Sequence, residues 1–219
     1  MIRAVLLDLD GTLMDTAGEI DAALARTFAE LGVAPLPRTN VEALIGKGVR
    51  SLLERALVHQ HANGIDVDAA VERFERHYAD VVGTTATLFP GVMPGLRLLH
   101  GSGRALAVIT NKPRLFTERL LFLAGIESFF TVVITGDDGI RRKPAGDMLL
   151  AACARLDCVP AETLMLGDSD NDIIAARAAG CPVWCVPYGY NEGRPAEALA
   201  CDRLVASAEE AARMIIAGR

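Results

Sequence analysis

The chain has 219 residues, of which 51% are hydrophobic and 23% are charged, a mixture that excludes an intrinsically disordered protein. The formal net charge of −6 gives no overall attraction to nucleic acid, and the densest basic cluster, at 141–143, is too short for a binding patch. No apolar run approaches the ~18 residues that span a bilayer, so we expect neither a nucleic acid nor a membrane as partner.

The N-terminal segment and the cysteines indicate the compartment. The apolar stretch at 2–9 is interrupted by Asp8, which is wrong for a signal peptide. The five cysteines are odd in number, form no C-x-x-C pair and lie in apolar surroundings typical of free thiols. These features predict a cytoplasmic protein.

Five apolar runs predict buried strands. Each run is nearly continuous rather than alternating, and each is followed by a segment of helical length. Two of these helices have clear ends, because Gly125 follows the one predicted at 111–124 and Gly180 follows the one predicted at 169–179. The pattern predicts an α/β fold with a doubly wound, Rossmann-like parallel sheet. The predicted strands are 4–9, 105–110, 132–135, 163–166 and 182–186.

Nearly a hundred residues separate the first two predicted strands, far more than a simple crossover requires. Apolar residues in this stretch recur at helical spacing. We therefore expect a helical domain at 16–84, inserted into an α/β domain formed by 1–15 and 85–219. The residues at helical spacing are Ile20, Leu24, Phe28 and Leu31, then Leu52, Leu53, Ala56 and Leu57, then Val71, Phe74, Tyr78 and Val81.

Two carboxylates, those of Asp8 and Asp10, stand at the end of the first predicted strand. Ligands bind at the carboxyl ends of the strands in parallel sheets. Carboxylates this close repel each other and lose hydration, unless a cation or hydrogen-bond donors compensate. Mg²⁺ suits this position, because it prefers hard oxygen ligands and is often held by one or two carboxylates plus a substrate phosphate.

Other strand ends add groups that suit phosphoryl transfer. Thr110 and Asn111 follow the second predicted strand, Asp168 follows the fourth, and Lys143 precedes a predicted helix. A phosphate dianion beside several aspartates meets a repulsion of about 4 kcal/mol per charge pair at about 4 Å and an effective dielectric of about 20. We therefore expect that both Mg²⁺ and Lys143 are needed to bind substrate.

These segments, taken in order, resemble the four motifs of the haloacid dehalogenase superfamily, in its phosphatase branch. They are D-L-D-G-T at 8–12, Thr110 with Asn111, Lys143, and G-D-S-D-N-D at 167–172. The helical insertion is similar to the family's small cap, and the resemblance covers essentially the whole chain. Three further segments, V-I-T-N-K-P at 108–113, G-D-D at 136–138 and V-P-Y-G-Y-N at 186–191, resemble phosphoglycolate phosphatases.

The resemblance implies a role for each matching residue. Asp8 is implied as the nucleophile that forms an aspartyl-phosphate, and Asp10 as the acid and base. Mg²⁺ is implied to be held by Asp8, Asp168 and the backbone carbonyl of Asp10. The other implied roles are phosphoryl binding by Thr110, Asn111 and Lys143, and support of the site by Thr12 and Asp172.

The favoured reaction is hydrolysis of a small phosphorylated metabolite, 2-phosphoglycolate, and the sequence leaves monomer and homodimer both open. A β-phosphoglucomutase-like mutase or a pyrophosphatase shares the motifs, and a noncatalytic binder of phosphorylated metabolites is the alternative from another class. A dehalogenase is disfavoured, because such relatives lack the second aspartate, which is Asp10 here. A phosphonate hydrolase would need a Schiff-base lysine in the insertion, where Lys47 is the only lysine.

Three of the candidate residues keep a second interpretation. Lys47, between two glycines in a loop of the insertion, either contacts the carboxylate of the substrate or is a solvated lysine at a helix entry. Arg50 carries the same two interpretations. Asp172 either supports the metal waters or Lys143, or is an ordinary first-turn helix acid favoured by the macrodipole.

Overall fold

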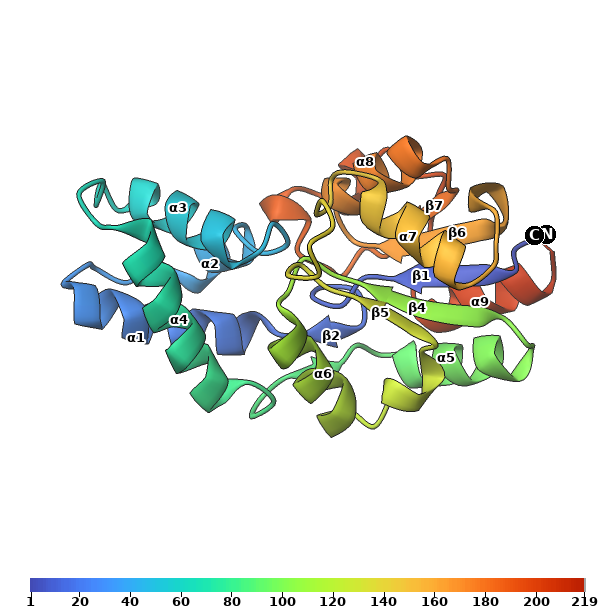
Figure 1. The fold of residues 1–219 in the computed structure, drawn as a ribbon, viewed down its shortest axis with the longest axis horizontal. Coiled ribbons are helices and arrows are strands. Elements are labelled where there is room, and N and C mark those ends of the chain that lie inside the picture. Colours follow the sequence, from blue (N-terminus) through green and yellow to red (C-terminus); the bar gives the residue numbers. More distant parts are fainter. Residues whose placement is uncertain (219) are drawn as a thin grey trace.

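Six parallel strands form the central sheet in the computed structural model, which describes residues 1–218 (Figure 1). The strand order is β5-β4-β1-β6-β7-β8, which becomes 3-2-1-4-5-6 when these six strands are numbered along the chain. This is the order of a doubly wound sheet, so the predicted fold class is confirmed. The strands are β1 (Ala4–Leu7), β4 (Ala105–Ile109), β5 (Val132–Ile134), β6 (Thr163–Gly167), β7 (Val183–Cys185) and β8 (Arg203–Leu204).

Helices cover both faces of the sheet, because successive strand residues point to opposite sides. In β1, Val5 and Leu7 pack into one hydrophobic cluster and Leu6 packs into the other. Helices α5, α6 and α9 lie on the first face, and α7 and α8 lie on the second (Figure 1). Their bounds are α5 (Val92–Gly101), α6 (Arg114–Leu123), α7 (Asp147–Arg155), α8 (Asp170–Ala179) and α9 (Ala208–Ile216).

A helical insertion, defined here as α1 to α4, lies beyond one end of the sheet (Figure 1). It is reached through a small antiparallel pair, β2 (Met14–Asp15) with β3 (Thr87–Leu88). Gly32 caps the C-terminus of helix α1 in a left-handed conformation, and Asp66 caps the N-terminus of α4 with a side chain that accepts from the Asp68 amide. The helices are α1 (Ala17–Leu31), α2 (Arg38–Glu42), α3 (Val49–His59) and α4 (Val67–Val81).

The structure departs from the sequence prediction mainly in its short elements. The helix expected at 111–124 begins only at Arg114, because Pro113 holds an extended conformation in front of it. Helix α2, the β2–β3 pair and β8 were not predicted, since two to five residues show no clear periodicity. Residues 1–218 also contain four short 3₁₀ helices, η1 (Glu127–Phe129), η2 (Pro160–Glu162), η3 (Asn191–Gly193) and η4 (Ala196–Ala198).

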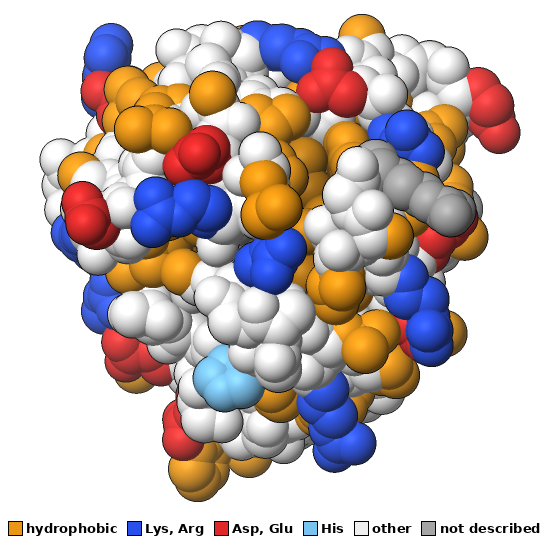
Figure 2. All heavy atoms as spheres, turned by 90° about the vertical axis from the view of Figure 1, so that its right-hand side faces the viewer, with side chains coloured by type: hydrophobic (Ala, Val, Ile, Leu, Met, Phe, Trp, Pro, Cys, Tyr) orange, Lys and Arg blue, Asp and Glu red, His pale blue; other side chains and the backbone are white. Residues whose placement is uncertain are grey.

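The surface carries charges of both signs. Figure 2 shows lysines and arginines interspersed with acidic residues on the face that lies at the far end from the helical insertion. Within residues 1–218, none of the helices combines the length and the apolar character that crossing a bilayer demands.

Candidate active site

Three neighbouring strands bring the predicted site residues to one edge of the sheet. Asp8 comes directly after β1, Thr110 after β4 and Asp168 after β6. Strand β1 lies between β4 and β6. The three carboxyl ends therefore meet at the edge that faces the helical insertion (Figure 1).

Lys143, which lies in the loop before α7, binds two carboxylates at this edge. Its Nζ lies 2.8 Å from Oδ1 of Asp8 and 2.7 Å from Oδ1 of Asp172. The lysine side chain is 1% exposed, so water screens these contacts little. Burial, the largest effect, lowers the pKa of Lys143, but Asp172 and Asp8 together raise it above its usual value. Lys143 therefore stays charged at neutral pH.

Asp8, Asp168 and Asp172 form a buried cluster, with one carboxylate oxygen of each within 4.8 Å of the others. When all three are ionised, their charge of −3 and the +1 of Lys143 leave −2, which one divalent cation neutralises. Burial raises the pKa of Asp8 well above its usual value, and the neighbouring Asp172 and Asp168 add to this despite Lys143. Burial and Asp172 raise the pKa of Asp168 to about 7. These residues fit a hard divalent cation such as Mg²⁺.

Asp168 sits in a close-fitting cradle. Its Oδ1 accepts from the Thr12 hydroxyl at 3.1 Å and its Oδ2 accepts from the Tyr190 amide at 2.7 Å. A Cβ on Gly11 would come within 2.4 Å of Asp168 Oδ2, and a Cβ on Gly189 within 2.2 Å of Asp168 Cβ. Two glycines therefore let the backbone close around a carboxylate whose orientation is held, as a metal ligand requires.

We expect the raised pKa of Asp168 to appear as a pH-dependent stability difference. Its pKa in the folded protein is about 7, against about 3.9 for an unperturbed aspartate, so the folded state binds the proton more tightly. In EDTA, the stability that protonation provides is complete below about pH 4 and is lost as pH rises to about 7. Wild type should therefore lose stability relative to Asp168→Asn over this range in urea unfolding. Mg²⁺ should reverse the loss. If the difference in unfolding free energy between the two proteins does not change with pH, the raised pKa of Asp168 is contradicted.

Asp172 contacts both Lys143 and the first turn of α8. Its Oδ2 accepts from the amide and the hydroxyl of Ser169, at 3.2 and 2.9 Å, as a first-turn helix acid does. Its Oδ1 holds Lys143. Since both oxygens are engaged and the residue is fully buried, Asp172 orients Lys143 and the start of α8. Asp170, in the same helical turn, points outward to Arg194.

Asp10 is held by a lysine for which the sequence analysis assigned no role. Lys112 Nζ donates to both Asp10 oxygens, at 2.9 and 3.1 Å, and the Thr16 hydroxyl donates to Oδ1 at 2.6 Å. Lys112 also lies over the ring of Tyr78, 4.7 Å from its centroid. Lys112 stands inside the segment V-I-T-N-K-P, so the sequence indicates that it lies near the site. The sequence does not indicate that its partner is Asp10.

Thr110 and Asn111 take different positions at the end of β4. Thr110 is buried, and its hydroxyl accepts from the Lys112 amide at 3.2 Å. Asn111 Nδ2 donates to the carbonyls of Gly46 and Lys143, each at 2.9 Å. Because Gly46 belongs to the loop before α3, Asn111 joins the helical insertion to the edge of the sheet.

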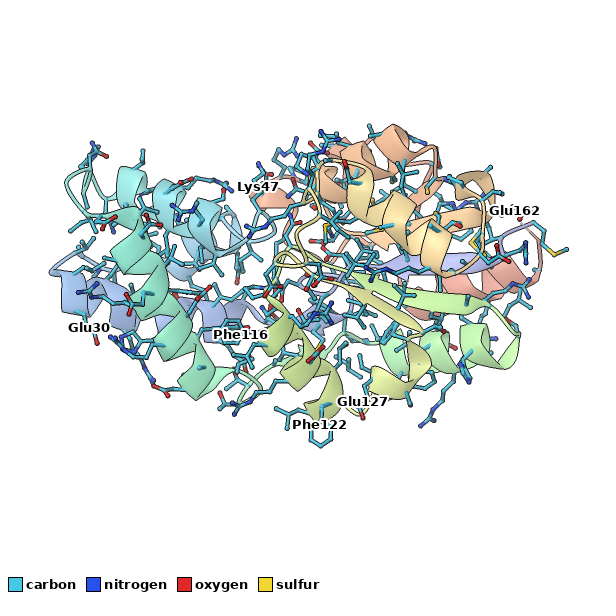
Figure 3. All side chains as sticks on the ribbon, in the orientation of Figure 1. Glu30, Lys47, Phe116, Phe122, Glu127 and Glu162 are labelled. Carbon is cyan, nitrogen blue, oxygen red and sulfur yellow. The ribbon has the colours of Figure 1, made fainter. Side chains whose placement is uncertain are left out.

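A cavity lies between the helical insertion and the sheet edge. Asp8, Asp10, Thr110, Asn111 and Lys112 line it from the sheet side. The insertion contributes mainly apolar side chains, and Phe116 of α6, labelled in Figure 3, packs edge-on against Tyr78 with ring centroids 4.8 Å apart. The site therefore has a polar floor and an apolar roof, an arrangement typical of small-molecule sites.

The two cationic candidates of the insertion lie outside this cavity. Lys47 lies where the insertion approaches the sheet domain (Figure 3), and its Nζ is 2.5 Å from Glu192 Oε1. Arg50 pairs with Asp68, and both of these side chains are at least half exposed. The structure thus does not bring Lys47 and Arg50 together with Asp8 and Asp10.

Comparison with known proteins agrees with this geometry. Residues 5–186 match the family model for haloacid dehalogenase-like hydrolases. The chain belongs to the haloacid dehalogenase-like hydrolases. Among curated members of related sequence, a phosphoglycolate phosphatase of Nitrosospira multiformis is 42% identical, with 98% of this chain and 96% of the relative covered. A plasmid-encoded phosphoglycolate phosphatase of Cupriavidus necator is 46% identical, with 94% and 90% covered.

Two solved structures share the fold over nearly the whole chain. A crystal structure described as a predicted phosphoglycolate phosphatase from Haemophilus somnus superposes with a TM-score of 0.92 at 25% identity, covering 98% of both chains. CbbY from Rhodobacter sphaeroides, solved in complex with phosphate, superposes with a TM-score of 0.81 at 28% identity, covering 96% of both chains.

Proposed function

We propose that this haloacid dehalogenase-like chain is a Mg²⁺-dependent phosphatase that hydrolyses 2-phosphoglycolate to glycolate and phosphate. The observation that carries the proposal is the buried cluster of Asp8, Asp168 and Asp172. Lys143 alone does not neutralise the charge of these three carboxylates. The names of the curated relatives, which match most of the chain, support the choice of substrate.

The proposed binding mode uses the polar residues at the sheet edge, some of which line the cavity. Asp8, Asp168 and the backbone carbonyl of Asp10 would hold Mg²⁺, which when bound offsets the negative charge of the phosphoryl group. Thr110, Asn111 and Lys143 would bind phosphoryl oxygens. Lys143 is already fixed by Asp172, so its charge needs little reorganisation when the substrate arrives.

The proposed reaction has two displacements. A carboxylate oxygen of Asp8 attacks phosphorus, the ester P–O bond breaks, and Asp10 gives its proton to the departing alkoxide. Water then attacks phosphorus while Asp10 takes back a proton, the bond between phosphorus and Asp8 breaks, and phosphate leaves. Asp8 Oδ1 already accepts from the Leu9 amide at 2.7 Å and from Lys143, so the carboxylate is oriented before the substrate binds.

We further propose that residues 16–84 form a cap that closes over this reaction and excludes water. The contact between Asn111 Nδ2 and Gly46 supports closure at the sheet edge.

Phosphate release by the purified wild-type chain tests the proposal. We expect turnover of 2-phosphoglycolate with Mg²⁺, little turnover of pyrophosphate, and loss of activity in EDTA that Mg²⁺ restores. Conversion of β-glucose 1-phosphate to glucose 6-phosphate as the main activity would instead identify a mutase. Binding of 2-phosphoglycolate without release of phosphate from any ester would identify a noncatalytic binder.

A further inference from the structure

Lys112 is the single cationic side chain that lines the cavity, among the residues that the structure describes. The other charged side chains of the lining are Asp8 and Asp10. A second anionic group on a substrate would therefore enter a space that already holds two carboxylates. Such a group needs a positive partner there, because an unpaired buried charge is strongly unfavourable.

The position of Lys112 puts its charge close to the leaving group. Its Nζ contacts both oxygens of Asp10, the proposed donor to the leaving oxygen. The side chain is 5% exposed and is supported by the ring of Tyr78, so its charge is fixed and poorly screened. Burial, the largest effect, lowers the pKa of Lys112, but Asp10 and Tyr78 raise it above its usual value.

The other candidate cations have partners elsewhere. Lys143 is enclosed between Asp8 and Asp172 and belongs to the phosphoryl end of the site. Lys47 is paired with Glu192, and Arg50 with an exposed aspartate of α4. Lys112 lines the cavity, whereas Lys47 and Arg50 do not, so Lys112 is the cation available to an acidic group next to the leaving oxygen.

We propose that Lys112 is the residue that selects substrates with a carboxylate next to the phosphate ester, by contacting that carboxylate from the position it holds beside Asp10. The inference rests on the proposed function and adds the group that recognises the acid. Lys47 and Arg50 of the insertion are the alternative candidates for this contact, and both are paired with acidic residues outside the cavity lining.

The chemistry of the substrate explains why Lys112 can contact both Asp10 and the substrate carboxylate. In 2-phosphoglycolate the carboxylate is attached to the carbon that carries the ester oxygen. A group that hydrogen-bonds to Asp10, while Asp10 contacts that oxygen, is therefore also within reach of the substrate carboxylate. When the substrate binds, Lys112 can donate hydrogen bonds both to Asp10 and to the substrate carboxylate, since an ammonium group has three donors.

The experiment compares 2-phosphoglycolate with its amide, 2-amino-2-oxoethyl phosphate, which has nearly the same shape and no carboxylate charge. For wild type we expect kcat/KM to favour the acid by about 10- to 150-fold, the value of one charge-assisted hydrogen bond. In Lys112→Met the preference should fall to within about threefold. Loss of support for Asp10 slows both substrates alike and cancels in this ratio.

Further variants keep the inference falsifiable. Lys112→Gln retains a donor for Asp10 without the charge, and it should lose the preference even if Lys112→Met fails to fold. Lys47→Met and Arg50→Met are matched controls that should keep the wild-type preference. If both Lys112 variants keep the preference, or if Lys47→Met abolishes it, the inference is overturned. A wild type that hydrolyses acid and amide equally with Mg²⁺ also overturns it, while leaving the phosphatase proposal intact.

Discussion

The Asp8→Asn variant is expected to lower kcat for 2-phosphoglycolate by about four orders of magnitude or more. The amide has no carboxylate oxygen to attack phosphorus, so the route through the aspartyl-phosphate is closed. We also expect rapid-quench experiments with labelled substrate to detect a phosphoenzyme in wild type and none in this variant. Normal turnover by Asp8→Asn would refute the role of Asp8 as nucleophile.

The same variant should keep its fold, which separates a chemical defect from a structural one. Asp8 is buried and its pKa is raised, so the neutral amide removes repulsion with Asp168 and Asp172. Lys143 retains its contact with Asp172. The melting temperature in EDTA should therefore equal or exceed that of wild type. Asp170→Asn is the matched control, since Asp170 pairs with Arg194 on the surface, and its activity should stay within about twofold of wild type.

The Lys143→Met variant is expected to lose both activity and stability. Without the ammonium group, three buried carboxylates face one another, and breaking such a buried ion pair costs about 3–5 kcal/mol of unfolding free energy. Removal of one preorganised charge at the phosphoryl group should also lower kcat by about 10²- to 10³-fold. Urea unfolding at pH 7.5 in EDTA measures the first effect, and steady-state kinetics with saturating Mg²⁺ measures the second.

The stability loss in Lys143→Met should depend on pH and on the cation. Loss of the lysine raises the pKa values of Asp8 and Asp168 further, so their protonated forms stabilise the folded state at low pH. That stability is lost as pH rises, and the deficit against wild type should be larger at pH 7.5 than at pH 5. Mg²⁺ should recover part of it. Lys47→Met, which alters a partly exposed pair, should change the unfolding free energy by no more than about 0.5 kcal/mol at either pH.

The sequence predicts those parts of the fold whose cause is local. The continuous apolar runs gave five strands of the sheet to within two residues at each end, and Gly125 and Gly180 marked helix ends. Strand β8 was missed, because its two residues are exposed and follow no pattern. The short pair β2–β3 was missed because its strands pair only once the chain returns from the insertion.

The site shows the same division between local and distant causes. The meeting of Asp8, Asp168 and Lys143 was predictable, since carboxyl ends of parallel strands share one edge. The contact of Lys112 with Asp10 was not, because the lysine side chain also packs on Tyr78 of the distant helix α4. The surroundings of Lys47 depend on the arrangement of the insertion and of the 191–193 segment, which local sequence does not specify.

The strand order determines when the acidic cluster of Asp8, Asp168 and Asp172 can form during synthesis. Asp8 leaves the ribosome early, but its partner strand β6, which ends just before Asp168, is made some 160 residues later. Until then β1 has one open edge, and the nascent chain has neither Asp168 nor Asp172 to complete the acidic cluster. Pairing of β6 with β1 covers that edge and brings Asp168 beside Asp8, and α8, which follows directly, adds Asp172. A chain truncated before β6 would therefore lack the acidic cluster.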